Sequence, residues 1–232
     1  MGVTLAVRDV HVRLAGVVIL RGVSLEVPAD AIVGLVGRNG AGKTTTLKSI
    51  VGLVPVAAGE IRVDGRDLTR TPPHRRLRLG AGYLPGYLPE DRRLIGSLTV
   101  EENLLLPVWA ARPEEGSRPL AGLYDLMPEL RPLAGRRAAA LSGGQQKLVA
   151  LARAVMTSDR LLLLDEPLEG LSPALAQRLA EVIRGLRGAA VLVTESDLNR
   201  MRMMTDRIYT IERGEIVGTA EGAGPRGTQE AP

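Results

Sequence analysis

The chain has 232 residues, of which 45% are hydrophobic and 24% charged, with no cysteine and a formal net charge of +4. This composition is typical of a soluble globular protein with a substantial core, and the lack of cysteine excludes disulfides and thiolate chemistry. The arginines lie in short pairs such as Arg75-Arg76, and aromatic residues are only 2% of the chain, so we expect no nucleic-acid partner.

The basic pairs are typical of a solvated face or of contact with a membrane-embedded partner near anionic headgroups. No apolar run reaches the roughly 18 residues that a spanning helix needs. The first residues also lack the basic start and long apolar core of a secretion signal. We therefore expect a soluble protein, or one that is at most peripheral to a membrane.

The chain up to residue 89 predicts mostly strands. Short alternating apolar runs from Val3 to Val27 favour antiparallel strands, and Ala31–Val36 is a continuous apolar run of the kind buried on both faces of a sheet. Three further elements are predicted here: a strand at Glu60–Val63 before the turn Asp64-Gly65, a helix start at Thr71–Pro73, and a strand at Ala81–Leu84.

A glycine-rich segment follows the Ala31–Val36 strand and matches the phosphate-binding loop pattern. Its glycines let successive backbone N–H groups converge on phosphate oxygens, next to the positive end of the following helix. Its lysine supplies a point charge for the outer phosphates, and its threonine offers a hydroxyl to Mg²⁺. The segment consists of Gly37, Arg38, Asn39, Gly40, Ala41, Gly42, Lys43 and Thr44, and Thr45 continues into the helix.

Residues 90–159 have the pattern of a helical subdomain inserted into an α/β core formed by residues 1–89 and 160–220. Thr99 and Glu102 form a capping box ahead of an apolar run. Apolar residues at helical spacing resume near Leu120 and Leu148, and the prolines between them keep the helices short.

The core then resumes with alternating strands and helices, which predict a mainly parallel sheet. The expected elements are a strand at Arg160–Leu164, a helix at Pro173–Arg187, a strand at Ala189–Thr194, a short helix near Leu198–Met204, and strands at Ile208–Ile211 and Glu215–Val217. Residues 221–232 are small and polar, and we expect a disordered tail.

Two carboxylates, Asp165 and Glu166, follow the strand Leu161–Leu164, at the edge of an α/β sheet where ligands bind. The first suits an Mg²⁺-linked role, and the second suits a general base that polarises water in line with the γ-phosphate. A strand-ending acidic turn is the alternative, but the phosphate loop in the same chain favours the chemical role.

A second anion-binding helix start is predicted where Ser142, Gly143, Gly144 and Gln145 enter a helix at Lys147–Met156. The plain alternative is an N-cap with flexible glycines. Because one nucleotide needs only one such site, we infer that this segment serves a nucleotide held by another chain.

These three motifs, in this order, resemble the nucleotide-binding subunit of an ABC transporter, over about residues 3 to 220. The resemblance implies a P-loop ATPase core, Mg²⁺-dependent ATP hydrolysis, and a head-to-tail dimer in which Ser142 of one chain closes the Gly37–Thr44 site of the other. It also implies membrane permease subunits as partners and, through them, a periplasmic solute-binding protein, with the cassette peripheral on the inner face of the cytoplasmic membrane.

Three further segments are similar in sequence to the ATP-binding subunits of branched-chain amino acid importers: Leu88–Arg93, Leu98–Leu104 and Asp165–Pro173. Urea and short-amide importers share much of this sequence. A regulatory ATP-binding half-site and a non-transport ABC ATPase are the remaining alternatives. Relatives that act on ribosomes usually carry two tandem domains and those of DNA repair carry long coiled coils, and this chain has neither.

The chain departs from the family pattern at four positions. Leu14 falls where an adenine-stacking aromatic is usual, so a weaker apolar contact is expected. Glu90 stands in place of a Gln, as in this importer subgroup, and Ser172 in place of an Asp. Ser196 replaces the histidine that usually senses the γ-phosphate, and we expect slower hydrolysis as a result.

Overall fold

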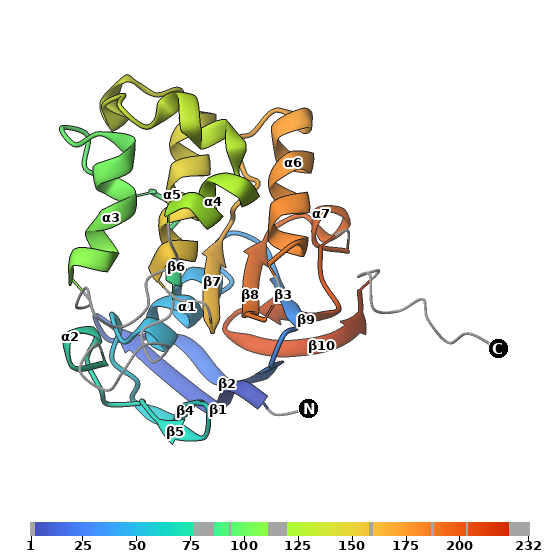
Figure 1. Ribbon diagram of the computed structural model, residues 1–232. Helices are drawn as coiled ribbons and strands as arrows, with labels where there is room; N and C mark the ends of the chain where they lie inside the picture. The colour runs from blue at the N-terminus through green and yellow to red at the C-terminus, as the bar shows by residue number, and fades with distance from the viewer. Residues whose placement is uncertain are drawn as a thin grey trace.

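The computed structural model describes residues 3–76, 86–92, 94–110, 120–157, 160–186, 188–202 and 204–222. They form an antiparallel sheet, a mainly parallel sheet and a layer of helices, as Figure 1 shows. The strand expected at Ala81–Leu84 lies outside the described residues, as does the expected tail beyond residue 222. Among the described helices, none has the length and apolar character needed to cross a bilayer.

The antiparallel sheet has the strand order β2-β1-β4-β5. Strands β1 and β2 pair along their length and confirm the antiparallel strands predicted for the first residues. The bounds are β1 Val3–Leu14, β2 Val17–Pro28, β4 Ala58–Val63 and β5 Arg66–Asp67.

The second sheet has the order β10-β9-β3-β8-β7-β6, and every neighbouring pair in it is parallel except β10 with β9. The mainly parallel sheet predicted from the alternation of strands and helices is therefore confirmed. Strand β10 runs on to Glu221, which we expected to begin the tail. The bounds are β3 Ile32–Val36, β6 Gly86–Leu88, β7 Leu161–Asp165, β8 Ala190–Glu195, β9 Arg207–Glu212 and β10 Glu215–Glu221.

Helices α3 to α6 cover one face of the parallel sheet, and the antiparallel sheet lies on its other side (Figure 1). Thr99 and Glu102 form the predicted capping box before α3, since each backbone N–H donates to the other side chain, at 2.7 and 3.2 Å. The helices are α1 Lys43–Val51, α2 Pro73–Arg76, α3 Val100–Ala110, α4 Leu120–Leu126, α5 Gly143–Thr157, α6 Pro173–Arg184 and α7 Leu198–Arg202, with 3₁₀ turns at Pro128–Leu133 and Ala138–Ala140.

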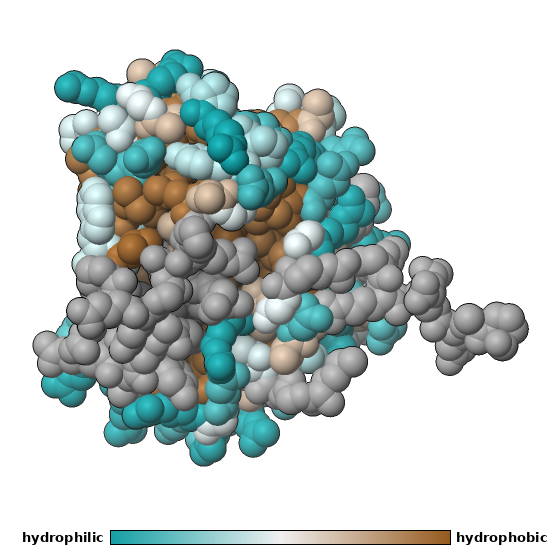
Figure 2. All heavy atoms as spheres, viewed as in Figure 1, coloured by the Kyte–Doolittle hydropathy of each residue, from teal (hydrophilic) through white to brown (hydrophobic). Residues whose placement is uncertain are grey.

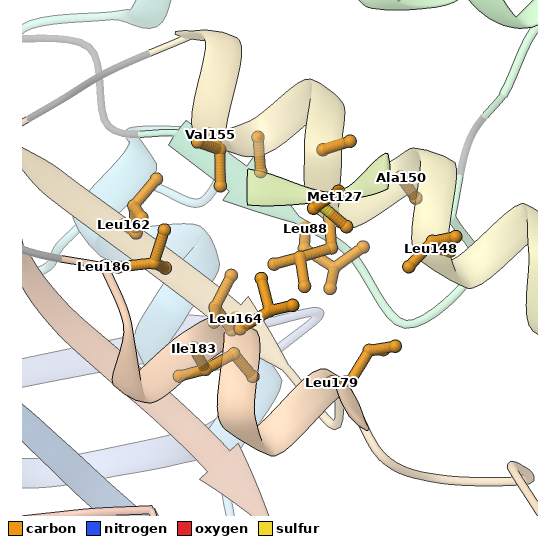
Figure 3. Packing of buried hydrophobic residues seen from close by; sticks show 14 of the residues in the cluster. Leu88, Met127, Leu148, Ala150, Val155, Leu162, Leu164, Leu179, Ile183 and Leu186 are labelled. Atoms are coloured by element: carbon orange, nitrogen blue, oxygen red, sulfur yellow. The ribbon is translucent and has the colours of Figure 1, made fainter. Parts of the chain in front are cut away.

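Strand β7 carries four consecutive leucines and is buried on both faces, which explains its continuous apolar run. Leu162 and Leu164 pack into the core beneath the helices, as Figure 3 shows. Leu161 and Leu163 face the opposite way, into the core shared with α1 and the antiparallel sheet. Two cores on opposite faces therefore fix this strand, and with it the position of the carboxylates at its end.

Arg76 corrects the expectation that the basic pairs are solvated. Arg75 is exposed, but Arg76 is fully buried, and its guanidinium donates to the backbone carbonyl oxygens of Thr71, Leu68 and Ile50. Burial lowers the pKa of Arg76 to about 10. Five fixed donors let one guanidinium join the end of α1 to the chain before α2, which lysine could not do as well.

Arg76→Met is expected to lower the free energy of unfolding by about 3 kcal/mol, because buried carbonyl groups lose their donors. Urea unfolding followed by circular dichroism measures this. The matched control is Arg75→Met at the exposed neighbour, which should change the free energy of unfolding by no more than about 0.5 kcal/mol. Equal effects of the two variants would contradict the buried role.

Candidate active site

The candidate site lies at the carboxyl ends of three neighbouring parallel strands, where ligands of α/β sheets bind. The glycine loop follows β3, the two carboxylates end β7, and Ser196 follows β8, the strand between them. A cavity of about 390 Å³ opens there, lined by Ile19, Asn39, Gly40, Gly42, Lys43, Thr44, Thr45, Glu90 and Glu166. The fold thus brings together the loop, Glu90 and Glu166, which are far apart in the sequence.

The glycine loop has the predicted arrangement of strand, loop and helix, and two of its glycines are required by geometry. Gly42 has a φ of +112°, which side chains rarely adopt. A Cβ at Gly37 would lie 2.4 Å from the carbonyl oxygen of Ile211. Helix α1 begins with no side-chain cap and no acidic residue in its first turn, so its first amides are available to an anion.

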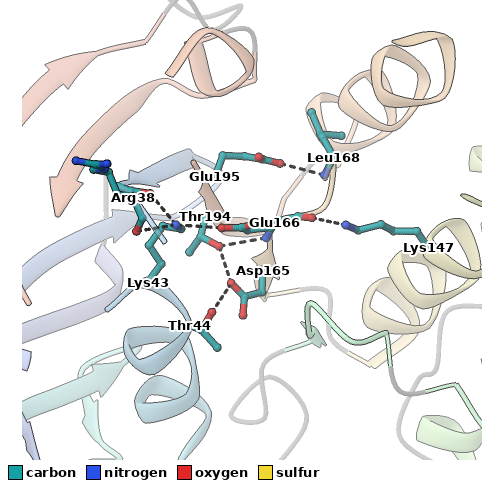
Figure 4. Close-up of polar contacts among 10 residues, drawn as sticks. Arg38, Lys43, Thr44, Lys147, Asp165, Glu166, Leu168, Thr194 and Glu195 are labelled. Atoms are coloured by element: carbon teal, nitrogen blue, oxygen red, sulfur yellow. Dashed lines mark hydrogen bonds and ion pairs between the residues drawn. The ribbon is translucent and has the colours of Figure 1, made fainter. Parts of the chain in front are cut away.

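Lys43 and Glu166 form an ion pair inside the cavity (Figure 4). Lys43 Nζ lies 3.0 Å from Glu166 Oε1 and donates to the carbonyl oxygens of Gly37 at 2.6 Å and Arg38 at 3.3 Å. Both side chains are buried, so little water screens the attraction. The candidate base and the lysine expected to bind the outer phosphates are therefore held together.

Asp165 and Thr44 supply oxygen atoms that suit Mg²⁺. Asp165 Oδ1 accepts hydrogen bonds from the hydroxyls of Thr44 at 3.2 Å and Thr194 at 2.8 Å. Its Oδ2 is buried, with no hydrogen-bond partner in the part of the chain that the structure describes, and burial raises the pKa of this carboxyl. Within that part no group of three or more acidic, His or Cys residues could hold a metal. Mg²⁺ needs no such group, because phosphate and water commonly complete its shell.

Glu166 has a strained backbone. Its φ is +47°, a region that costs a residue with a side chain about 1–3 kcal/mol. Its N–H is held by β8, since it donates to the carbonyl oxygen of Thr194 at 3.1 Å and to the hydroxyl of the same residue at 3.2 Å. Strain that neighbouring contacts maintain is typical of functional positions.

Three other predicted positions, Leu14, Ser172 and Ser196, are not among the residues that line the cavity. Ser196 is exposed directly after β8, and Ser172 is the N-cap of α6. Leu14 ends β1 and is 38% exposed, whereas Ile19, across the hairpin, lines the cavity. The proposed roles of Leu14, Glu90 and Ser196 stay predictions.

The segment Ser142–Gln145 is not among the residues that line the cavity. It forms a capping box, in which Gln145 N–H donates to Ser142 Oγ at 3.3 Å and Ser142 N–H donates to Gln145 Oε1 at 3.0 Å. Helix α5 therefore begins at Gly143, and the predicted start at Lys147 was wrong.

Sequence reasoning missed Thr194, Glu195 and Lys147. Thr194 and Glu195 end β8, beside the strand that carries the carboxylates, and that position was the available signal. Glu195 is fully buried: Oε1 accepts from the Leu168 N–H at 3.0 Å, and Oε2 has no hydrogen-bond partner in the described chain. Burial raises the pKa of Glu195 from 4.5 to about 7.

The raised pKa of Glu195 predicts a pH dependence of stability. The folded chain binds this proton more tightly than the unfolded chain, so the free energy of unfolding falls as pH rises from 4.5 to about 7. Relative to Glu195→Gln, the wild type is expected to lose on the order of 3 kcal/mol across this window. Urea unfolding of both proteins at several pH values measures the difference, and a difference that is constant with pH would contradict the prediction.

Comparison with known proteins finds relatives that are ATP-binding proteins of transport systems. A sequence model of the ABC transporter family matches residues 20–169. The chain is 37% identical to the high-affinity branched-chain amino acid transport ATP-binding protein BraG of Pseudomonas aeruginosa, over 88% of this chain and 87% of that protein. It is 36% identical to the probable branched-chain amino acid transport ATP-binding protein LivF of Archaeoglobus fulgidus, over 87% and 86%. It is also 33% identical to the lipopolysaccharide export system ATP-binding protein LptB of Escherichia coli, over 92% and 89%.

Solved structures support the fold. The ADP conformation of MJ1267, an ATP-binding cassette of an ABC transporter, has a TM-score of 0.79 and 25% identity, covering 96% of this chain and 92% of that one. A dimeric post-hydrolysis state of the cassette MJ0796 bound to ADP and Pi has a TM-score of 0.80 at 24% identity, covering 94% and 98%. The second likeness concerns the fold alone.

Proposed function

The chain belongs to the ABC transporter family and is an ATP-binding ATPase, and we propose that it powers an importer of branched-chain amino acids. The ATPase assignment agrees with the cavity, where Lys43 and Glu166 meet at 3.0 Å. BraG and LivF, whose names carry branched-chain amino acid transport, match most of this chain and support the substrate class.

We assign the roles of the site residues as follows. The loop amides and Lys43 bind the phosphates of ATP, while Thr44 and Asp165 would hold Mg²⁺, which neutralises phosphate charge when bound. Glu166 accepts a proton from the attacking water and orients it, and Glu90, which also lines the cavity, contacts that water. When ATP binds, its phosphates replace the contact between Lys43 and Glu166, which frees the carboxylate for water.

We further propose that two cassettes close on ATP, with Ser142–Gln145 of one chain completing the Gly37–Thr44 site of the other. The position of Ser142–Gln145 supports this, because the segment does not line the cavity at this chain's own phosphate loop. A permease would dock on an apolar surface, and Trp109 on α3 is 56% exposed. Figure 2 shows hydrophobic residues gathered at the centre of one face of the molecule. The cassette then works at the inner face of the cytoplasmic membrane.

Uptake measurements in the cells that encode the chain test the substrate class. Deleting the gene should abolish energy-dependent uptake of labelled leucine, isoleucine and valine, and the wild-type gene but not Glu166→Gln should restore it. The likeness to LptB makes lipopolysaccharide export the second candidate. Unchanged amino acid uptake together with loss of lipopolysaccharide from the cell surface would replace the importer by that exporter, and loss of urea uptake alone would indicate the amide importers.

Ser196→His is expected to raise kcat several-fold, because an imidazole reaches further than a hydroxyl and can carry charge beside the γ-phosphate. Steady-state ATP hydrolysis at saturating Mg²⁺ and ATP measures the change. Asn199→His, at an exposed position on α7, adds the same ring three residues further along the chain and is the control. An unchanged kcat with unchanged ATP affinity would show that Ser196 does not limit the rate.

A further inference from the structure

Lys147, near the start of α5, has a buried ammonium group that reaches the segment following β7. Lys147 is only 3% exposed. Lys147 Nζ donates to the backbone carbonyl oxygens of Glu166 at 2.5 Å and Glu169 at 3.0 Å, and Figure 4 shows the first contact. Burying an ammonium group costs free energy unless the group is paired, so its burial here indicates that these two contacts have a role.

The contact with Glu166 bears on the strained residue of the active site. The Glu166 N–H is held by Thr194, and its carbonyl oxygen is held by Lys147, so the two peptide groups around φ +47° are fixed by two different elements. Without Lys147 the carbonyl keeps only the longer hydrogen bond from the Glu169 N–H, at 3.3 Å, and the backbone can relax to a conformation that costs less. That rotation would redirect the side chain away from Lys43.

A second side chain holds the same segment from β8. Glu195 Oε1 accepts from the Leu168 N–H at 3.0 Å, two residues after Glu166. Burial lowers the pKa of Lys147, and the carboxylates of Glu195 and Glu169 oppose this change by attraction. The segment from Glu166 to Glu169 is therefore clamped between α5 and β8.

We propose that Lys147 is a positioning residue for ATP hydrolysis, which holds the Glu166 backbone so that its carboxylate points into the cavity. The proposal rests on the assignment of Glu166 as the base. Helix α5 begins with Ser142–Gln145, the segment that we assign to the partner's nucleotide. One helix then joins the contact with the second ATP to the base that acts on the first.

Lys147→Met is the direct test, in the full-length chain. Because a displaced base costs rate rather than affinity, kcat should fall about 10- to 100-fold, with the KM for ATP and the Kd for MgATP within about twofold of wild type. Lys147→Arg, which keeps charged donors, should recover most of kcat. Arg178→Met is the matched control, since Arg178 on α6 also donates to a backbone carbonyl, that of Leu126, away from the cavity. Its kcat should equal that of wild type.

A double variant separates this proposal from the role of Glu166. If Lys147 acts through Glu166, Lys147→Met adds nothing to the residual rate of Glu166→Gln, whereas multiplied effects would overturn the proposal. A fully active Glu166→Gln would instead overturn the base assignment. If Lys147→Met does not fold, by circular dichroism and melting temperature, Lys147→Gln takes its place. Equal losses in the Gln and Arg variants, with raised KM, would show a merely structural role.

Discussion

Glu166→Gln is expected to lower kcat for ATP hydrolysis by about 10²- to 10⁴-fold, the usual contribution of a positioned general base. The amide keeps the size of the side chain but cannot accept the proton of the attacking water. Since it removes a negative charge that faces the phosphates, the Kd for MgATP should stay the same or fall. Steady-state hydrolysis and a fluorescent ATP analogue measure the two quantities separately.

Glu181→Gln, at an exposed position on α6, makes the same chemical change away from the cavity and should keep the wild-type rate. A further consequence of Glu166→Gln follows from the proposed dimer. With hydrolysis blocked, two chains should remain closed on ATP, so the variant should run as a dimer in size-exclusion chromatography with MgATP and as a monomer without it. A variant that hydrolyses ATP at the wild-type rate would exclude Glu166 as the base.

The parts of this site that local patterns encode were predictable. The strand before Gly37, the glycine loop and the helix after it depend on residues next to one another in the chain, as does the run of leucines that ends at Asp165. Mostly local backbone preferences and burial on both faces determine these elements. The predicted fold class was confirmed for the same reason.

The contacts that hold the site in place were not predictable, because their partners lie far apart in the sequence. Lys147 and Glu166 are 19 residues apart, and Thr194 and Asp165 are 29 apart. The burial of Arg76 could not be predicted, because nothing in its own segment shows that Ile50 and Leu68 offer carbonyl groups to it. The Lys147 start predicted for α5 is too late, because the capping box of Ser142 and Gln145 outweighs the low helix propensity of the two glycines.

The ion pair in the cavity connects binding with catalysis. In the structure the negative charge nearest to Lys43 is that of Glu166, although the phosphates of ATP require the same ammonium. With the roles proposed above, ATP would exchange one buried anion for another at Lys43, which limits the electrostatic cost of admitting the phosphates. By the same proposal, Glu166 becomes available to water only once the phosphates have taken its place at Lys43.

Lys43→Met is expected to weaken MgATP binding by about 2–5 kcal/mol, since it removes one partner of a buried charge contact and leaves Glu166 facing the phosphates unopposed. This corresponds to an increase in Kd of about 30-fold or more. Isothermal titration calorimetry measures it, with Arg75→Met as the control that removes one positive charge from an exposed position. In the double variant Lys43→Met/Glu166→Gln, part of the lost affinity should return, because the repulsion between carboxylate and phosphate is gone. Purely additive effects would mean that the two side chains act on ATP independently, despite their contact.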